Sequence, residues 1–355
     1  MDLRARSDAN TGSTAMRAGF ELDLAALESW LESNVDGFAG PLTAEQFKGG
    51  QSNPTYKLIT PAESYVLRSK PTGQLLASAH AIDREFRIIS ALGGTSVPVP
   101  HAYAFCRDES VIGRQFYLMS FTDGPIVWDL PTDRWAVEDR AAIWRAGVDV
   151  AANLHSVDPI VHDLGDFGKQ GGYVFRQFKR WSEQYRSKTR SAINNPAFDQ
   201  LMEWLPDRLP SDEPTAIVHG DLQLSNMILQ PDGKAVAALI DWELSTLGNP
   251  LSDFAYYCRD YYIPAEAGGF QGAVETLGIP PIQEMTARWS ATTGYPIDED
   301  WGVYVIFNMY RLAAIRQGVA QRIKDGTATS ANANVAAEGA VTMAENAWRL
   351  AKEMG

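Results

Sequence analysis

The chain has 355 residues, of which 45% are hydrophobic and 10% aromatic, so it can bury a large core and predicts two domains or lobes. It carries 31 basic and 44 acidic residues, and the net charge of −13 argues against a general binder of nucleic acids or anionic membranes. Cys106 and Cys258 lie far apart in the sequence, which predicts that both are free thiols. The sequence has neither an apolar N-terminal segment nor a run of about 18 apolar residues, so we expect a cytoplasmic protein.

The first part of the chain predicts a disordered leader, one helix and a set of strands. Residues 1–19 are small and polar without a hydrophobic period, which is typical of disorder. Apolar residues at helical spacing then predict a helix from Leu22 to Leu31. Residues 44–70 predict three strands, of which the first two are joined by a glycine-rich turn.

The glycine-rich turn has the composition of a phosphate-binding loop. Backbone amides around Gly49, Gly50, Ser52 and Asn53 could approach a phosphate closely because glycine has no Cβ. An ordinary hairpin turn explains the same residues, so both interpretations stay open at this point.

The third strand places a cation beside a small apolar residue. Strand alternation puts Val66, Arg68 and Lys70 on one face. This face would suit an adenine ring and its phosphates, and a surface strand with solvated charges is the alternative.

A helix and two further strands follow. Residues 78–92 predict a helix in which Glu85, beside the buried stripe, could reach a cation on the strand. The stripe itself consists of Ile82, Phe86, Ile89 and Leu92. Residues 97–108 and 114–124 predict strands, and the second could serve as a hinge between lobes with unpaired backbone groups after Met119.

Beyond residue 124 the pattern becomes mainly helical. Residues 140–159 predict a helix in which His155 is a structural or capping residue rather than a catalyst. Residues 252–355 are also largely helical, and the helix at 307–323 carries Arg311.

A basic segment stands out in this acidic protein. Residues 176–190 hold a single acid, Glu183, among six cations. The cations are Arg176, Lys179, Arg180, Arg186, Lys188 and Arg190. The segment is either a solvated helix face or a docking surface for an anionic substrate, to which Tyr173 and Trp181 would contribute.

The central stretch, residues 217–253, carries the strongest chemical signal. Asp221 closes a His-Gly-Asp triplet, Asn226 follows five residues later, and Asp241 lies fifteen residues after Asn226. Short apolar strands around a Pro-Asp-Gly turn would bring the two carboxylates together. Phosphoryl transfer needs one carboxylate to orient an attacking hydroxyl, and an amide oxygen with a second carboxylate to hold Mg²⁺, and protein kinases use a similar spacing.

These features also resemble a known family. The segments HGDLQLSNMIL, LIDWELSTLGNPLSDFAYY, FKGGQSNPTYKL and YVLRSKPTGQLLASAHAIDREFRII are similar to the aminoglycoside phosphotransferase-like (choline kinase-like) branch of the protein-kinase fold. They look most like the kinase-like domains fused to acyl-CoA dehydrogenases. The resemblance covers roughly residues 21–350 and implies an α+β, two-lobed fold: an antiparallel-sheet N-lobe at 20–122, a mainly helical C-lobe at 123–355, and an ATP cleft between them.

The resemblance also implies residue roles. Asp221 would orient the acceptor hydroxyl as base or positioner, and Asn226 and Asp241 would bind Mg²⁺. His219 and Asp253 would brace the catalytic loop. The ATP contacts would be Gly49, Gly50, Ser52 and Asn53 over the phosphates, Arg68 or Lys70 with Glu85, Met119 behind the adenine, and the backbone of Ser120 and Thr122 at its edge. The acceptor contacts would be Tyr173, Arg176, Lys179, Arg180 and Arg311, and Glu243 could approach the metal.

One position departs from the pattern of the family. Arg68 stands on the strand where most kinases carry a lysine, and Lys70 lies about 7 Å further along the same face. Arginine offers a planar fork of donors rather than a point charge. We expect Arg68 to pair with Glu85 and with the α- and β-phosphates, and Lys70 is the alternative.

The leading interpretation is ATP-dependent phosphorylation of a hydroxyl on a small molecule. A polycationic aminoglycoside would need an acidic acceptor site, so the basic segment at 176–190 favours an anionic acceptor, with a hydroxy-acyl compound or its CoA thioester as the hypothesis. A nucleotide-binding pseudokinase is the alternative. A metal-dependent phosphohydrolase is a third, but the sequence lacks the density of His and carboxylate ligands that such sites use.

Overall fold

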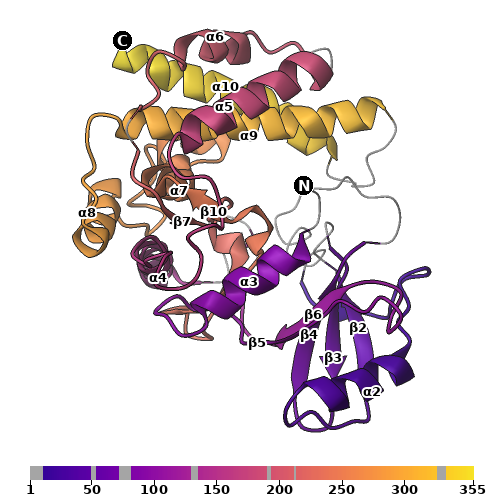
Figure 1. Ribbon diagram of the computed structural model, residues 1–355. Coiled ribbons are helices and arrows are strands. Elements are labelled where there is room, and N and C mark those ends of the chain that lie inside the picture. Colours follow the sequence, from indigo (N-terminus) through magenta and orange to yellow (C-terminus); the bar gives the residue numbers. More distant parts are fainter. Residues whose placement is uncertain are drawn as a thin grey trace. The chain divides into compact units, whose positions relative to one another are not determined.

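A computed structural model of the chain shows a sheet-containing part and a helical part (Figure 1). It describes residues 11–48, 53–71, 81–128, 135–189, 193–211, 213–325 and 333–355. The chain divides into two compact units. Unit 1 comprises Met1–Val150, His162–Leu164 and Leu224–Ser245, and unit 2 comprises Ala151–Val161, Gly165–Gln223 and Thr246–Gly355.

Unit 1 is built on an antiparallel sheet of six strands in the order β1-β2-β3-β4-β6-β5. The strands are β1 (Ser13–Thr14), β2 (Thr43–Phe47), β3 (Thr55–Ile59), β4 (Ser64–Ser69), β5 (Ala102–Cys106) and β6 (Phe116–Ser120). The strands predicted between residues 44 and 124 are therefore confirmed.

The structure corrects part of the prediction that residues 1–19 form a disordered leader. Residues 1–10 lie outside the described part of the chain, but Ser13–Thr14 pairs with β2. The Ser13 hydroxyl donates to Glu45 over 2.5 Å, and both the backbone amide and the side chain of Arg17 donate to the side-chain oxygen Oε1 of the buried Gln46. Disorder is thus wrong for residues 13–17, because a small polar segment without a hydrophobic period can still gain backbone pairing at a sheet edge.

Two helices accompany this sheet. The helix α2 (Leu24–Asn34) begins at Asp23, whose carboxylate accepts from the Ala26 amide, and packs its buried Leu27 and Leu31 into the core of the sheet. The helix α3 (Ile82–Leu92) buries most of its predicted stripe. The prediction that Phe86 belongs to the buried stripe is wrong, because Phe86 is only half-buried beside Phe105, while its neighbour Glu85 is buried.

The hairpin of β8 (Met227–Leu229) and β9 (Val236–Leu239) also belongs to unit 1. The Leu229 amide donates to the Pro125 carbonyl over 2.9 Å, and the Leu239 amide donates to the Pro98 carbonyl over 2.7 Å. A Cβ at Gly124 would lie 2.1 Å from the Leu229 carbonyl oxygen, so this close approach requires glycine. The lobe boundary predicted at residue 122 therefore differs from the observed division, because these bonds tie the hairpin to the sheet-bearing unit.

Unit 2 is mainly helical, as the sequence predicts for the C-terminal part. Its central element is α9 (Trp301–Lys324), which contacts α5, α6, α7 and α10 (Figure 1). The other helices are α5 (Tyr173–Gln184) with a π-helical turn at Tyr185–Thr189, α6 (Pro196–Trp204), α7 (Pro250–Cys258), α8 (Ile282–Thr293) and α10 (Ala333–Met354). A two-stranded sheet pairs β7 (Ala216–Val218) with β10 (Thr246–Gly248), and α4 (Val137–His155) contributes residues to both units.

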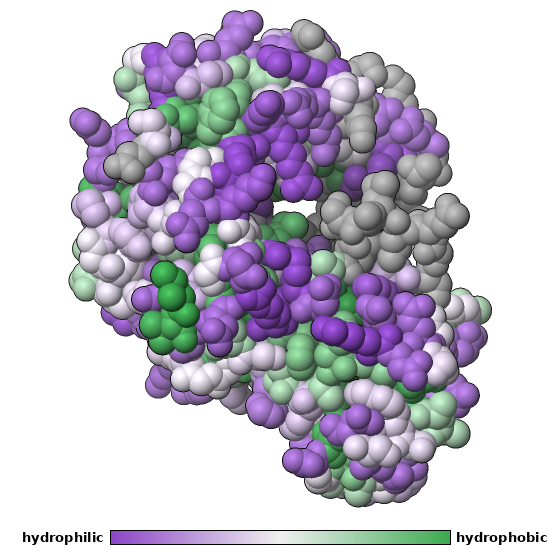
Figure 2. Space-filling model, viewed as in Figure 1, coloured by the Kyte–Doolittle hydropathy of each residue, from purple (hydrophilic) through white to green (hydrophobic). Residues whose placement is uncertain are grey.

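The visible surface is largely hydrophilic, with small separated apolar patches (Figure 2). Across the described ranges, no helix is both long and apolar enough to cross a membrane. Cys106 and Cys258 are buried free thiols, as predicted.

Candidate active site

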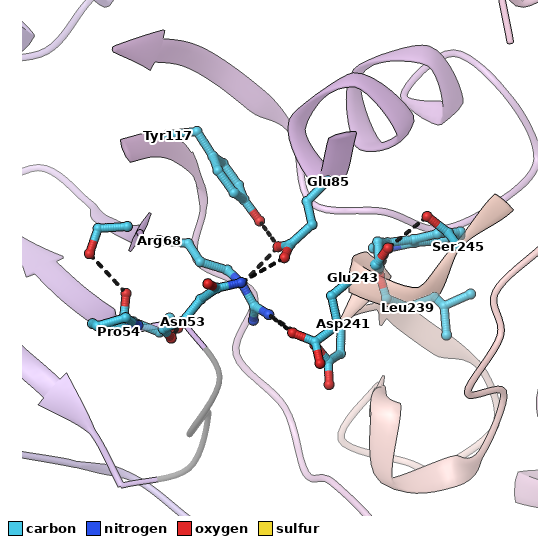
Figure 3. A network of polar contacts seen from close by, with 12 residues as sticks. Asn53, Pro54, Arg68, Glu85, Tyr117, Leu239, Asp241, Glu243 and Ser245 are labelled. Carbon is cyan, nitrogen blue, oxygen red and sulfur yellow. Dashed lines mark hydrogen bonds and ion pairs between the residues drawn. The ribbon is translucent and has the colours of Figure 1, made fainter. Parts of the chain in front are cut away.

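A buried arginine joins three carboxylates in unit 1. The Arg68 side chain extends from β4, and its Nε lies 2.7 Å from Glu85 Oε2 on α3 (Figure 3). Its Nη2 lies 3.0 Å from Asp241 Oδ1 and 3.4 Å from Glu243 Oε2, just after β9. Burial alone would lower the pKa of Arg68, but the charge of Glu85 and the neighbouring acids raises it, so the guanidinium stays charged.

Glu85 is the most deeply buried of the three carboxylates, with 1% of its surface exposed. Besides Arg68, its carboxylate accepts from Asn53 Nδ2 over 2.9 Å and from the Tyr117 hydroxyl over 3.0 Å (Figure 3). Burial raises the pKa of Tyr117 and keeps its hydroxyl protonated as a donor. Burial also raises the pKa of Glu85, and the positive charge of Arg68 opposes that shift. Because three donors surround the Glu85 carboxylate, we assign it as charged.

The ion pair predicted between Arg68 and Glu85 is therefore present. Lys70, the alternative cation, instead donates to Gln115 Oε1 over 2.7 Å. Asn53 anchors one end of the predicted phosphate loop, while Gly49, Gly50 and Ser52 lie outside the described residues. Contact of any of these residues with a nucleotide stays a prediction.

The predicted adenine surface lies on neighbouring strands. Met119 of β6 is the register partner of Val66 of β4, and both are buried. The Ser120 amide donates to the His101 carbonyl over 2.8 Å, and contact of the Ser120 backbone with an adenine edge stays a prediction. Thr122 is half-buried just after β6, and its contact with adenine stays a prediction.

The two predicted metal ligands lie at one end of the β8–β9 hairpin. The Ile240 amide donates to the Asn226 carbonyl over 2.9 Å, which places Asn226 beside the residue before Asp241. Asp241 has φ 69° and ψ 59°, a left-handed conformation that costs a non-glycine residue about 1–3 kcal/mol and occurs often at functional sites. Its carboxylate is 38% exposed.

The donor chemistry of this hairpin end fits Mg²⁺, which prefers carboxylate and amide oxygens together with phosphates. Among the residues that the structure describes, no group of three or more His, Cys, Asp or Glu side chains could hold a metal ion. Mg²⁺ commonly takes a few protein oxygens and completes its shell with water or phosphate oxygens, and Asn226 with Asp241 could supply the protein oxygens.

In unit 2 a buried carboxylate holds the loop that carries Asp221. Asp253 of α7 accepts from the His219 amide over 2.8 Å and from the Gly220 amide over 2.9 Å. His155 Nε2 lies 3.1 Å from the same carboxylate, and Trp289 Nε1 donates to His155 Nδ1 over 3.0 Å. The Trp289 bond places the His155 proton on Nε2, so His155 is a structural donor, as predicted.

His219 and Asp253 brace the loop as expected from the sequence. His219 Nδ1 accepts from the Asp221 amide over 3.3 Å, and Arg311 donates to the Gly220 carbonyl. The Asp221 carboxylate accepts from the Tyr256 hydroxyl over 2.7 Å, a contact that no motif or spacing in the sequence predicts.

The predicted acceptor residues have different environments in unit 2. Tyr173 is buried, and Arg176 donates to backbone carbonyls of Lys169 and Gly171 at the start of α5. Lys179 and Arg180 are exposed, whereas Arg311 is 5% exposed and supports the Asp221 loop. Of the five, Lys179 and Arg180 present their charges most openly to solvent.

Replacement of Glu85 tests the buried pair. Glu85→Gln leaves Arg68 without its shortest ion pair, and we expect a loss of about 3–5 kcal/mol in unfolding free energy, measured by urea denaturation. The matched control is Glu353→Gln, because Glu353 pairs with Arg349 at 2.7 Å on the surface and should cost less than about 1 kcal/mol. Equal stability of Glu85→Gln and wild type would show that Glu85 is protonated in the folded protein.

The pH dependence of stability tests Asp253. Burial disfavours its charge, but the hydrogen bonds that it accepts from His155 and from the His219 amide lower its pKa. The carboxylate therefore stabilises the fold above its unfolded pKa, near about 4, and this contribution is lost as the pH falls through the lower folded value.

We expect Asp253→Asn to lower the unfolding free energy by about 2–4 kcal/mol near neutral pH. The deficit relative to wild type should shrink below about pH 4 in urea titrations at several pH values. Asp207→Asn, at an exposed position, serves as the control. A deficit that stays constant down to about pH 2 would contradict the account.

Comparisons with known proteins place this geometry in a family. The model of a family described as "Phosphotransferase enzyme family" matches residues 43–287. Acyl-CoA dehydrogenase family member 10 of Mus musculus is 43% identical over 335 residues, covering 93% of this chain and 31% of that protein. Acyl-CoA dehydrogenase family member 11 of Mus musculus is 36% identical over 355 residues, covering 98% of this chain and 45% of that protein. The chain therefore spans less than half the length of these two relatives.

Solved structures agree with this family. A Ralstonia eutropha protein, provisionally named an aminoglycoside phosphotransferase, superposes with a TM-score of 0.84 at 45% identity, covering 94% of this chain and 99% of that one. A thermostable mutant of an aminoglycoside phosphotransferase, solved with ADP and hygromycin B, shares the fold alone, with a TM-score of 0.59 at 13% identity over 92% of this chain and 98% of that one. The chain therefore belongs to the phosphotransferase enzyme family, as the family match and the relatives show and as its antiparallel sheet and helical unit agree.

Proposed function

We propose that the protein transfers the terminal phosphoryl group of ATP to a hydroxyl of a small molecule. The observation that carries this proposal is the Arg68 network, in which a buried cation is aligned by Glu85 while also contacting Asp241. Phosphoryl transfer depends on positioning and charge neutralisation rather than on a covalent intermediate, and a pre-aligned cation beside a metal-binding carboxylate supplies both.

The unit 1 residues that this proposal uses have separate roles. Arg68 offers a planar fork of donors to phosphate oxygens, and Val66 with Met119 offers an apolar surface to the base. Asn226 and Asp241 would hold Mg²⁺, which when bound neutralises charge on the phosphates.

Asp221 would accept a hydrogen bond from the acceptor hydroxyl and orient its oxygen for attack. As the hydroxyl oxygen bonds to phosphorus, the bond from phosphorus to the leaving oxygen of ADP breaks, and the hydroxyl proton passes to Asp221 or to solvent.

We propose an anionic hydroxy-acyl compound, for example a CoA thioester, as the acceptor. Two observations support this choice over an aminoglycoside. Lys179 and Arg180 are exposed on α5, where they would repel a polycation and attract an anion. The relatives with the same domain carry acyl-CoA dehydrogenase names, although the chain matches only part of each.

A second candidate function is nucleotide binding without transfer. It is favoured by the contact between Arg68 and Asp241, since the arginine occupies an oxygen that a metal would otherwise use. The presence of Asp221 disfavours it, because a module that only binds nucleotide has no need of a carboxylate for the acceptor.

Release of ADP separates the two functions. With Mg·ATP and a panel of hydroxylated acceptors, including 3-hydroxyacyl-CoA thioesters, we expect ADP release that a suitable acceptor stimulates and EDTA abolishes. Asp221→Asn should lower kcat by about 10²–10⁴-fold with little change in ATP affinity, since only the acceptor loses its partner. The control is Asp207→Asn, at an exposed position of unit 2. ATP binding without acceptor-stimulated ADP release would support the binding module and overturn the proposal.

Charge reversal on α5 tests the acceptor class. The double variant Lys179→Glu and Arg180→Glu should raise the KM for an acyl-CoA acceptor roughly 10-fold at low salt and leave the KM for ATP unchanged. Arg176 is kept, because its guanidinium supports the start of α5.

The matched control is Arg208→Glu with Lys352→Glu. Arg208 and Lys352 are also exposed, and Arg208 lies over the Trp204 ring as Arg180 lies over the Trp181 ring. Equal effects of both double variants on the acceptor KM would show a general charge effect rather than a docking surface.

A further inference from the structure

The carboxylate of Asp221 is held at both oxygens by side chains to which the proposed function assigns no role. The Tyr256 hydroxyl donates to Oδ1 over 2.7 Å. Gln223 Nε2 donates to Oδ2 over 3.0 Å. Because the two donors engage different oxygens, rotation of the carboxylate about its last torsion would break both hydrogen bonds.

Tyr256 is itself held firmly. The side chain lies on α7 and is 4% exposed. The guanidinium carbon of Arg259 lies 4.2 Å from the ring centroid, and that of Arg311 lies 5.1 Å from it. Both contacts are attractive cation–π interactions. The ring therefore has little freedom to move its hydroxyl away from Asp221.

Arg259 connects the two donors. Its Nη1 donates to the Tyr256 carbonyl over 2.7 Å, and its Nη2 donates to Gln223 Oε1 over 3.4 Å. The second bond fixes the orientation of the amide, because Oε1 faces a donor and Nε2 must therefore face Asp221. A single guanidinium thus supports both groups that hold the carboxylate.

The Tyr256 hydroxyl stays protonated. Burial, followed by the negative charge of Asp221, raises the pKa of the phenol above its ordinary value. The hydroxyl therefore stays a donor across the neutral range. Arg311 adds a further constraint, because it donates to the carbonyl of Gly220, the residue before Asp221.

We propose that Tyr256 is a positioning residue that, with Gln223, fixes the Asp221 carboxylate in the orientation that receives the acceptor hydroxyl. This inference rests on the proposed function for the reaction, but the fixed carboxylate is a structural claim of its own. A carboxylate held in one orientation presents its remaining lone pairs in constant directions, so less ordering is left to the moment of transfer.

Removal of the hydroxyl alone tests this role. Tyr256→Phe keeps the ring against both guanidinium groups and deletes only the donor to Asp221. The matched control is Tyr261→Phe: Tyr261 is 6% exposed, and its hydroxyl donates to the Pro280 carbonyl over 2.9 Å. Each variant loses one hydrogen bond of a buried tyrosine, part-buried for Tyr256 and buried for Tyr261, so we expect both to have a lower melting temperature than wild type.

Kinetics should separate the two variants. With Mg·ATP and the acceptor found by ADP release, Tyr256→Phe should lower kcat about 10-fold or more and leave the KM for ATP unchanged. Tyr261→Phe should keep the wild-type kcat. A Tyr256→Phe enzyme with the kcat of Tyr261→Phe would overturn the inference, because the hydroxyl would then contribute only stability.

A spectroscopic measurement keeps the inference separate from the proposed function. In protein labelled with carbon-13 at the aspartate carboxyl groups, the Asp221 signal is assigned by its loss in Asp221→Asn. We expect this signal to shift and broaden in Tyr256→Phe and in Gln223→Leu, and to keep its position in Tyr261→Phe. An unchanged Asp221 signal in Tyr256→Phe would refute the positioning role. If wild type released no ADP with any acceptor, the proposed function would fail, and this signal alone would decide the inference.

Discussion

The structure depends first on burying the guanidinium of Arg68. A buried charge is tolerated only when it is paired and hydrogen-bonded, and its three partners here come from two separate parts of unit 1. Glu85 fixes α3 against β4, and Asp241 and Glu243 bring the end of the β8–β9 hairpin to the same cation. The strained backbone of Asp241 is consistent with this demand, because its left-handed conformation persists only where the surroundings hold it.

Unit 2 meets the same physical problem with the charges reversed. There the buried group is an anion, Asp253, and its donors are two backbone amides and the Nε2 of His155. The amides belong to His219 and Gly220, so satisfying one buried carboxylate also shapes the loop that ends at Asp221. In each unit, the partners that a buried charge requires also position residues proposed for chemistry: Arg68 contacts Asp241 in unit 1, and Asp253 holds the loop of Asp221 in unit 2.

The parts of this arrangement that follow local periodicity could be predicted. Strand alternation placed Arg68 on the correct face, and helical spacing placed Glu85 beside the buried stripe. The family resemblance, rather than residue spacing, predicted that Asp253 braces the loop that carries Asp221. The contact of Arg311 with the Gly220 carbonyl could not be predicted, because a long side chain on a helix gives no sign of which loop it will reach. Tyr256 was missed for the same reason, since its contact with Asp221 spans 35 positions. The predicted contact of Arg311 with the acceptor stays a prediction.

The central claim is that Arg68, rather than Lys70, is the cation that receives the nucleotide phosphates. Titration calorimetry with Mg·ATP tests it most directly, using the double variant Arg68→Met with Glu85→Gln, which leaves no uncompensated buried charge, and Lys70→Met as its partner. Circular dichroism verifies that both variants are folded. We expect the double variant to weaken ATP binding by about 10-fold or more and Lys70→Met to keep the wild-type affinity. Loss of binding in Lys70→Met with retention in the Arg68 variant would contradict it.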